Sequence, residues 1–322
     1  MRGARGFAVG FAALLAVLVA LPAVVSLFSV RLLTEVFIWA LLAMSLDLLM
    51  GYLGLVSFAH AALAGIGAYS MGLLINRAGL GVWPAVVLGV AAAALVALLM
   101  GVFSVRVRDI YFGIVTLVFG TIAFIVVWTW TALTGGEDGF RVLVQTLPLP
   151  GGRQLDLRDL HVAYYVSLAV VAGSYLLARR MMASPLGRVF QAIRENEERT
   201  QFMGYATNRY KVAGAAISGA FAGLAGCLYL LRGGVIGADF LHVHKSGVVV
   251  IWALVGGMGT LIGPMLGAAL VTYLTDLFSN WTENYLILVG LLFVAAVLFL
   301  PHGIIGVLRG VLRQRLGAAP PE

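Results

Sequence analysis

"WPAVVLGVAAAALVALLMGVFSV" occupies residues 83–105, and this run contains no charged residue and no polar side chain before Ser104. An amphipathic helix of a soluble protein would show polar residues at helical spacing, and this run shows none. About 20 consecutive apolar residues are enough to cross the hydrocarbon core of a bilayer as a helix. The stretch therefore predicts a membrane-spanning helix over 83–104 and argues against a water-soluble protein.

The rest of the chain has the same character. Of its 322 residues, 61% are hydrophobic and 11% are charged, and the mean hydropathy is +1.02. Such values are typical of an integral membrane protein. We therefore expect one all-α membrane domain over 1–322, a polytopic bundle of about ten transmembrane helices. The expected spans are 7–29, 32–50, 54–75, 83–104, 110–133, 161–178, 212–231, two shortened helices within 246–279, and 285–300.

The basic residues predict the orientation. Arg2 and Arg5 precede an apolar run that is longer than a signal-peptide core and lacks a clear cleavage site, so we expect an uncleaved first span. With the N-terminus in the cytoplasm, six crossings return the chain there at Arg179. The basic segment 179–211 is then cytoplasmic, and 134–160 lies outside. Three further arginines predict a cytoplasmic C-terminus: Arg309, Arg313 and Arg315.

The net charge of +7 follows from the same rule, because cytoplasmic loops of membrane proteins are rich in basic residues. It does not require a nucleic-acid partner.

A helix break is expected within 246–279. This interval must cross the membrane twice to keep the C-terminus inside, yet it is too short for two full spans. Glycine and proline can interrupt a helix there, and such non-helical backbone must be covered by protein or line a water-filled cavity. The residues of the expected break are Gly256, Gly257, Gly259, Gly263 and Pro264.

Ionisable residues within membrane spans are costly and commonly functional. Asp47 lies near the end of the second expected span, and Ser57 and His60 are three positions apart in the third, so they would share a helix face. These three residues could line a polar translocation path. The alternative for His60 is that it caps or hydrogen-bonds a broken helix, and the sequence leaves both open.

Small residues recur four positions apart in several apolar segments. Each row places small side chains on one helix face, where a neighbouring backbone can approach closely. Two such rows are Ala64, Ala68 and Gly72, and Gly214, Ser218, Ala222 and Gly226.

Motifs for catalysis are missing from the sequence. A nucleotide-binding P-loop needs Gly-Lys-Ser/Thr, but the only lysines, Lys211 and Lys245, follow tyrosine and histidine. Cys227 is the only cysteine, no zinc motif occurs, and we expect His242 and His244 to be solvated in an outer loop rather than bound to a metal. We therefore predict no enzyme, no metal and no cofactor in this chain.

Charge is concentrated in "SPLGRVFQAIRENEERTQFMGY", residues 184–205. Ser184 before Pro185 predicts one capped helix, and Asn196, followed by two glutamates, predicts a second. Gly204 would end the second helix. Two short helices at the cytoplasmic surface suit docking to a soluble partner, although a solvated connector is the structural alternative.

This stretch resembles the cytoplasmic coupling loop of the M-type permease subunits of branched-chain amino acid ABC transporters. Three more stretches are similar to that family and occur in the family's order: "GYLGLVSFAHAALAGIGAYSMGLL", "RDIYFGIVTLVFG" followed by "TGGEDGF", and "LVGGMGTLIGPMLGA". Together they cover most of the chain from about Gly51 to Ala269.

The resemblance implies a subunit of a bacterial inner-membrane importer. This chain would pair with a second, homologous permease subunit in the lipid bilayer, two cytoplasmic ATPases would supply ATP and Mg²⁺, and a periplasmic binding protein would deliver the amino acid. The residues that the resemblance assigns to ATPase coupling are Arg188, Arg194, Glu195, Asn196, Glu197, Glu198, Arg199 and Gly204.

The sequence leaves two other functions open. Permeases of the same family import urea or short amides, and "GADFLHVHKSG" carries His242, His244 and Lys245 where a more neutral sequence is expected. The second alternative is a self-contained, proton-driven secondary transporter with Asp47 and His60 as its relay.

Overall fold

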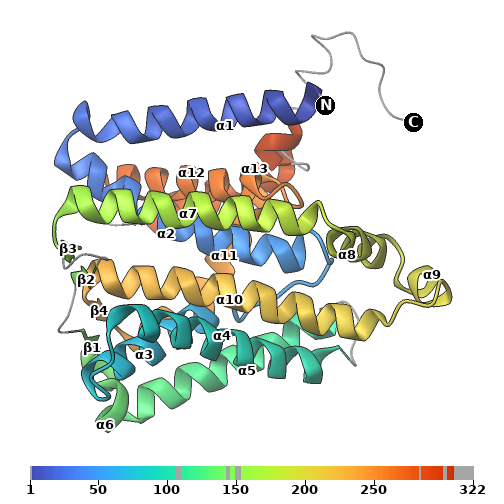
Figure 1. Ribbon diagram of the computed structural model, residues 1–322, viewed down its shortest axis with the longest axis horizontal. Coiled ribbons are helices and arrows are strands. Elements are labelled where there is room, and N and C mark those ends of the chain that lie inside the picture. The colour runs from blue at the N-terminus through green and yellow to red at the C-terminus, as the bar shows by residue number, and fades with distance from the viewer. Residues whose placement is uncertain are drawn as a thin grey trace.

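The computed structural model describes residues 2–105, 110–142, 146–148, 154–282, 284–299 and 303–307. It is a bundle of helices that run largely along one direction (Figure 1). The C-terminal arginines Arg309, Arg313 and Arg315 lie outside the described residues. The long helices are α1 (Arg2–Ala20), α2 (Leu27–Met50), α3 (His60–Asn76), α4 (Val82–Ser104), α5 (Ile110–Thr129), α7 (Leu160–Met182), α10 (Thr207–Gly233), α11 (Val243–Gly256), α12 (Ile262–Ser279) and α13 (Tyr285–Phe299).

Six helices of the described part are long and apolar enough to cross a membrane: α2, α4, α5, α7, α10 and α12. Helices α2 and α10 form the centre of the bundle, since α10 packs against α4, α3 and α2. Helix α4 instead leaves large apolar side chains such as Val87 and Leu95 exposed. A helix that is apolar on all sides and exposed on one is suited to a lipid or subunit contact. The all-α membrane bundle is therefore confirmed.

The first helix boundaries differ from the sequence prediction. Pro22 lies in a short 3₁₀ turn, η1 (Leu21–Ala23), and Ser26 caps α2 by accepting the N–H of Ser29 at 3.3 Å. Helix α2 consequently begins five residues before the predicted start at 32. The apolar run continues through this turn, so hydropathy alone gave no sign of it.

The third helix also begins late. Residues 51–59 are not helical, Gly54 has φ +81°, and α3 starts at His60 rather than at 54. Ser57 therefore lies in a loop, and the predicted shared helix face of Ser57 and His60 is wrong.

Small strands gather at one end of the bundle (Figure 1). β1 (Phe140–Arg141) pairs antiparallel with β4 (Val235–Ile236), which joins the segment after α5 to the end of α10. Next to β1 lie α6 (Thr131–Thr134) and η2 (Gly136–Asp138), and a separate pair joins β2 (Thr146–Pro148) to β3 (Gln154–Asp156). The sequence predicts an outer segment here but no strands.

The opposite end carries two short helices, α8 (Pro185–Glu195) and α9 (Glu197–Phe202), which extend beyond the other helices (Figure 1). Asn196 caps α9 as predicted, because its Oδ1 accepts the N–H of Arg199 at 2.8 Å. Ser184 precedes α8 but does not cap it with its side chain; its hydroxyl donates to the carbonyl of Met181 at 2.6 Å. Gly204 follows α9 with φ +90°.

The helix interruption falls within the expected glycine run. Helix α11 ends at Gly256 and α12 begins at Ile262, with Gly257 and Gly259 at positive φ between them. A Cβ added to Gly256 would overlap the backbone of Gly263, so the two helices approach closely at the break. With 14 residues, α11 is about 21 Å long, shorter than a hydrocarbon core of about 30 Å.

Candidate functional site

The carboxylate of Asp47, in the last turn of α2, holds the break between α11 and α12. Its Oδ1 accepts the N–H of Gly259 at 2.7 Å and its Oδ2 accepts the N–H of Leu261 at 2.9 Å. Asp47 is completely buried. Charge-assisted hydrogen bonds of this kind are among the stronger ones in proteins. Asp47 therefore fixes the backbone at the start of α12.

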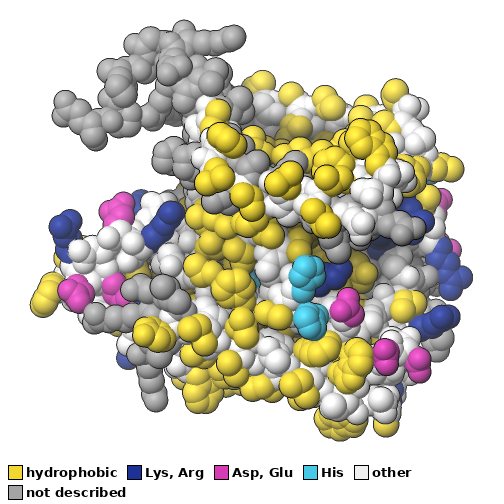
Figure 2. All heavy atoms as spheres, turned by 180° about the vertical axis from the view of Figure 1, so that it is seen from behind, with side chains coloured by type: hydrophobic (Ala, Val, Ile, Leu, Met, Phe, Trp, Pro, Cys, Tyr) yellow, Lys and Arg dark blue, Asp and Glu magenta, His cyan; other side chains and the backbone are white. Residues whose placement is uncertain are grey.

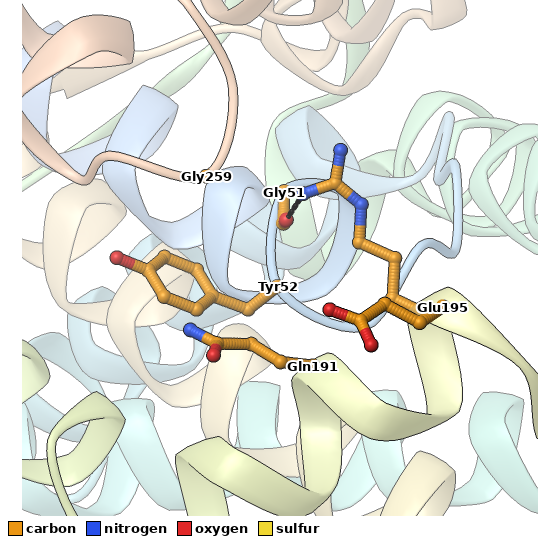
Figure 3. A pocket seen from close by; sticks show the side chains of 6 residues that line it. Gly51, Tyr52, Gln191, Glu195 and Gly259 are labelled. Carbon is orange, nitrogen blue, oxygen red and sulfur yellow. Dashed lines mark hydrogen bonds between the residues drawn. The ribbon is translucent and has the colours of Figure 1, made fainter. Parts of the chain in front are cut away.

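Arg194, near the end of α8, reaches the same place. Its guanidinium donates to the carbonyl of Gly51, the residue that follows α2 (Figure 3). A Cβ added to Gly259 would lie 3.0 Å from Arg194 Nη1, so the side chain also contacts the break. Arg194, predicted to couple to an ATPase, is exposed and at the same time bonds within its own chain.

A cavity of about 410 Å³ lies where these segments meet, lined by Gly51, Tyr52, Gln191, Arg194, Glu195 and Gly259. In Figure 3, the side chains of Tyr52 and Gln191 lie beside each other, and the carboxylate of Glu195 points toward the space between them and Gly51. The loop after α2, helix α8 and the α11–α12 break thus form one polar junction. A shift of α8 would have to disturb the other two segments.

Glu197 is also bonded within the chain. Lys211 Nζ lies 2.6 Å from the Glu197 carboxylate, and Thr207 donates its hydroxyl to Glu197 Oε1 at 3.2 Å. The Lys211 side chain is only 4% exposed. This pair joins the first turn of α9 to the first turn of α10. Glu197, predicted to contact an ATPase, therefore has a structural partner of its own.

The exposed part of the loop has a different composition. Six side chains of the predicted coupling residues are exposed, as expected for a charged surface: Arg188, Arg194, Glu195, Asn196, Glu198 and Arg199. Beside them stands an apolar tip, which we define as Phe202, Met203 and Tyr205, with exposed fractions of 91%, 60% and 44%. None of these three residues is among the coupling residues predicted from the sequence. The available signal was a group of large apolar residues at the end of a charged segment.

A groove of about 500 Å³ runs beside the tip. Met203 and Tyr205 form part of its wall, together with residues of α8 and the start of α10. The complete lining is Pro185, Leu186, Arg188, Val189, Ala192, Thr200, Met203, Tyr205 and Tyr210.

His60 belongs to a separate hydrogen-bonded group in the bundle interior. Its Nδ1 lies 3.1 Å from Ser57 Oγ, and its Nε2 lies 2.7 Å from Ser218 Oγ, which donates to the carbonyl of Ser45. All four residues are fully buried. Asp47 bonds the helix break instead, so the structure does not bring together the three residues expected to line a path.

Among the described residues, no group of three or more His, Cys, Asp or Glu side chains could hold a metal ion. Cys227 is buried and donates weakly to the carbonyl of Gly67.

Comparison with known proteins gives consistent matches. A family model described as the permease component of the branched-chain amino acid transport system matches residues 28–297. The chain is 30% identical to the high-affinity branched-chain amino acid transport system permease proteins LivM of Salmonella typhimurium and of Escherichia coli, over 96% of this chain and 77% of each relative. It is 26% identical to the permease protein BraD of Pseudomonas aeruginosa, over 83% of this chain and 91% of BraD. No solved structure matches the chain.

The family match covers most of the chain, and it includes α2, the α8–α9 loop and the α11–α12 break. The polar junction described above therefore lies entirely within the region that defines the family. The chain belongs to the family of branched-chain amino acid transport system permease components.

Proposed function

We propose that this chain is one of two permease subunits of an ATP-driven importer of branched-chain amino acids. The relatives that share 30% of its residues are named as permeases for these solutes. The observation that carries the proposal is the apolar tip, Phe202, Met203 and Tyr205, exposed on a loop that extends past the bundle (Figure 1). The sequence has no nucleotide-binding motif of its own.

An exposed apolar tip rimmed by charged residues is typical of a protein docking site. Arg199 is exposed three positions before Phe202, and Arg188 lines the adjoining groove. Aromatic and arginine side chains are the residues that most often dominate binding energy at interfaces. The tip is therefore the surface on which a cytoplasmic ATPase subunit would dock, with ATP and Mg²⁺ bound by that partner.

The polar junction gives the docked loop a mechanical connection to the membrane helices. Helix α8 contacts Gly51 through Arg194, and the same region holds the α11–α12 break through Asp47. An ATPase that moves α8 as a rigid body would thereby shift α2, α11 and α12 together.

The remaining features follow from the same assignment. The chain would cross the bacterial inner membrane ten times, once at each long helix, with non-helical segments completing the crossings at α3 and α11, and both termini would lie in the cytoplasm. The strand-bearing end would face the periplasmic binding protein, and the second permease would cover part of the exposed apolar surface. A periplasmic reporter enzyme fused after Arg315 is expected to be inactive, and an active fusion would contradict this topology.

The test is co-purification of tagged full-length chain from its native membrane, with ATP-dependent leucine uptake measured in parallel. Phe202→Ala is expected to reduce the bound ATPase and the uptake about tenfold or more, because it removes an interface anchor. Phe28→Ala is the matched control, since Phe28 is 59% exposed and lies at the start of α2, away from the loop. The proposal would be overturned if the Phe202→Ala variant bound as much ATPase as the unmodified chain. It would also be overturned if urea, but not isoleucine, competed with leucine for uptake.

A further inference from the structure

Four polar or charged side chains lie close together on an otherwise apolar face. They come from η3 (Ala238–Leu241) and from the start of α11. Figure 2 shows histidine side chains beside a basic and an acidic side chain, with hydrophobic side chains around them. We define the η3–α11 cluster as Asp239, His242, His244 and Lys245.

Two contacts place this cluster near the middle of the membrane-spanning part. Lys245 Nζ lies 5.9 Å from the ring centroid of Trp39. Trp39 is near the middle of the 24-residue helix α2, about 17 Å from either end. Next to the cluster, Ser246 Oγ accepts the N–H of Ala61 at 3.1 Å, so α3 and α11 begin at a similar depth.

The predicted outer loop is therefore wrong for these residues: His242 caps α11, and His244 and Lys245 lie in its first turn. The chain re-enters the bundle after β4, and α11 starts partway across it. The ring of His242 meets the ring of Phe124 on α5 edge to face, with 5.1 Å between the centroids. The cluster is thus held against α2 and α5.

A charged side chain at this depth is costly in lipid, so such residues face protein or a water-filled cavity. Within the described part of the chain, Lys245 forms no ion pair. Asp239 and His244 are exposed, whereas His242 and Lys245 are half-buried. On this chain the cluster is open on one side, and that side must meet water or polar groups.

The opposite side of the cluster is aromatic. Trp39 contacts Tyr229, Phe240 and Trp252, with ring centroids 5.6, 5.7 and 5.4 Å away. Charged groups packed against aromatic rings could bind a solute that carries a positive charge, a negative charge and an apolar side chain. The N-terminus of α11 adds partial positive charge, and interrupted helices of transporters direct such ends at anionic solute groups near the membrane midplane.

We propose that the η3–α11 cluster is a solute-contact site within the translocation path and takes a zwitterionic α-amino acid. Lys245 and His242 bind the carboxylate, and Asp239 binds the ammonium group. His244 lines the aqueous side. The proposal rests on the function of the chain as an importer subunit and adds the chemistry by which the permease itself contacts the solute.

The first test measures water access with a single cysteine. Cys227, the only native cysteine, is changed to alanine, and His244→Cys is introduced into the full complex of permeases, ATPases and binding protein in liposomes. A charged, membrane-impermeant thiosulfonate is expected to label this cysteine in at least one nucleotide state, and leucine is expected to slow the labelling severalfold. Leu95→Cys is the control, because Leu95 is 58% exposed on the apolar helix α4 and should remain unlabelled.

Absence of labelling at His244→Cys would overturn the proposal and indicate that the second permease covers the cluster. Labelling that leucine does not slow would overturn it as well. Both outcomes differ from a failure of the proposed importer function. If that function were wrong, the unmodified complex would lack ATPase subunits or leucine uptake altogether.

The second test separates binding from assembly. Lys245→Met is expected to reduce leucine uptake about tenfold while the complex keeps its ATPase subunits and its stimulation of ATP hydrolysis by the binding protein. Lys245→Arg keeps the charge and should restore most of the uptake. Arg180→Met removes an exposed positive charge in the last turn of α7 and serves as the control for charge loss. Unchanged uptake in Lys245→Met would overturn the proposal.

Discussion

Asp47 Oδ2 accepts the backbone N–H of Leu261 at 2.9 Å, although the two residues are 214 positions apart in the sequence. Leu261 has φ 60° and is the only non-glycine residue with positive φ in the described part of the chain. Such a backbone conformation costs about 1–3 kcal/mol and persists only where the surrounding structure holds it. The carboxylate at the end of α2 is thus what stabilises a strained start of α12.

Asp47→Asn is therefore expected to destabilise the chain. The amide is nearly the same size, but it offers one acceptor oxygen and turns a donor toward the second N–H. One buried backbone N–H then lacks a partner, which costs about 1–3 kcal/mol. Thermal unfolding of the purified protein in detergent would measure this loss.

Thr34→Val is the control for that experiment. Thr34 is also buried on α2, but its hydroxyl donates only to the carbonyl of Val30 in the same helix. Its loss should cost about 1 kcal/mol or less. Equal stability of Asp47→Asn and the unmodified protein would show that the break does not depend on the carboxylate.

The Glu197–Lys211 pair predicts that the stability losses of two single variants do not add up in the double variant. Glu197→Gln leaves the nearly buried Lys211 ammonium without its carboxylate, and breaking a buried pair from one side costs about 3–5 kcal/mol. Since Glu197 is 27% exposed, the cost here should lie at or below the lower end of that range. Combining it with Lys211→Met should recover part of the loss. Unfolding temperatures of the two single variants and the double variant test this, and strictly additive losses would contradict it.

Arg194→Ala is expected to separate ATP hydrolysis from transport. The guanidinium of this exposed residue bonds Gly51 and contacts the break, and it does not line the groove beside the apolar tip. The ATPase should therefore remain bound, while leucine imported per ATP hydrolysed falls severalfold. Arg209→Ala, an exposed arginine at the start of α10, is the control. A loss of ATPase binding in Arg194→Ala would assign the residue to the docking surface instead.

The sequence predictions were accurate where neighbouring residues determine the structure and inaccurate where distant residues do. The span predicted over 83–104 is a helix from Val82 to Ser104, and Asn196 caps α9, because both follow from neighbouring residues. The start of α3 was misplaced, because residues 51–59 are apolar without being helical. The direction of Arg194 depends on a carbonyl 143 positions away, and no local pattern encodes it.

The packing of α3 against α10 predicts opposite effects of alanine at two glycines of α10. A Cβ added to Gly226 would overlap the backbone carbonyl of Ala64 on α3, consistent with the predicted close approach of these small-residue faces. Gly226→Ala should therefore push α3 and α10 apart and cost about 1–3 kcal/mol. Gly233→Ala is the matched control, because a Cβ there meets no atom within 4 Å. Its backbone does not have positive φ, so alanine should be neutral or stabilise by up to about 1 kcal/mol. Unfolding temperatures that rank the two variants in the opposite order would show that α3 and α10 are not packed as closely as described.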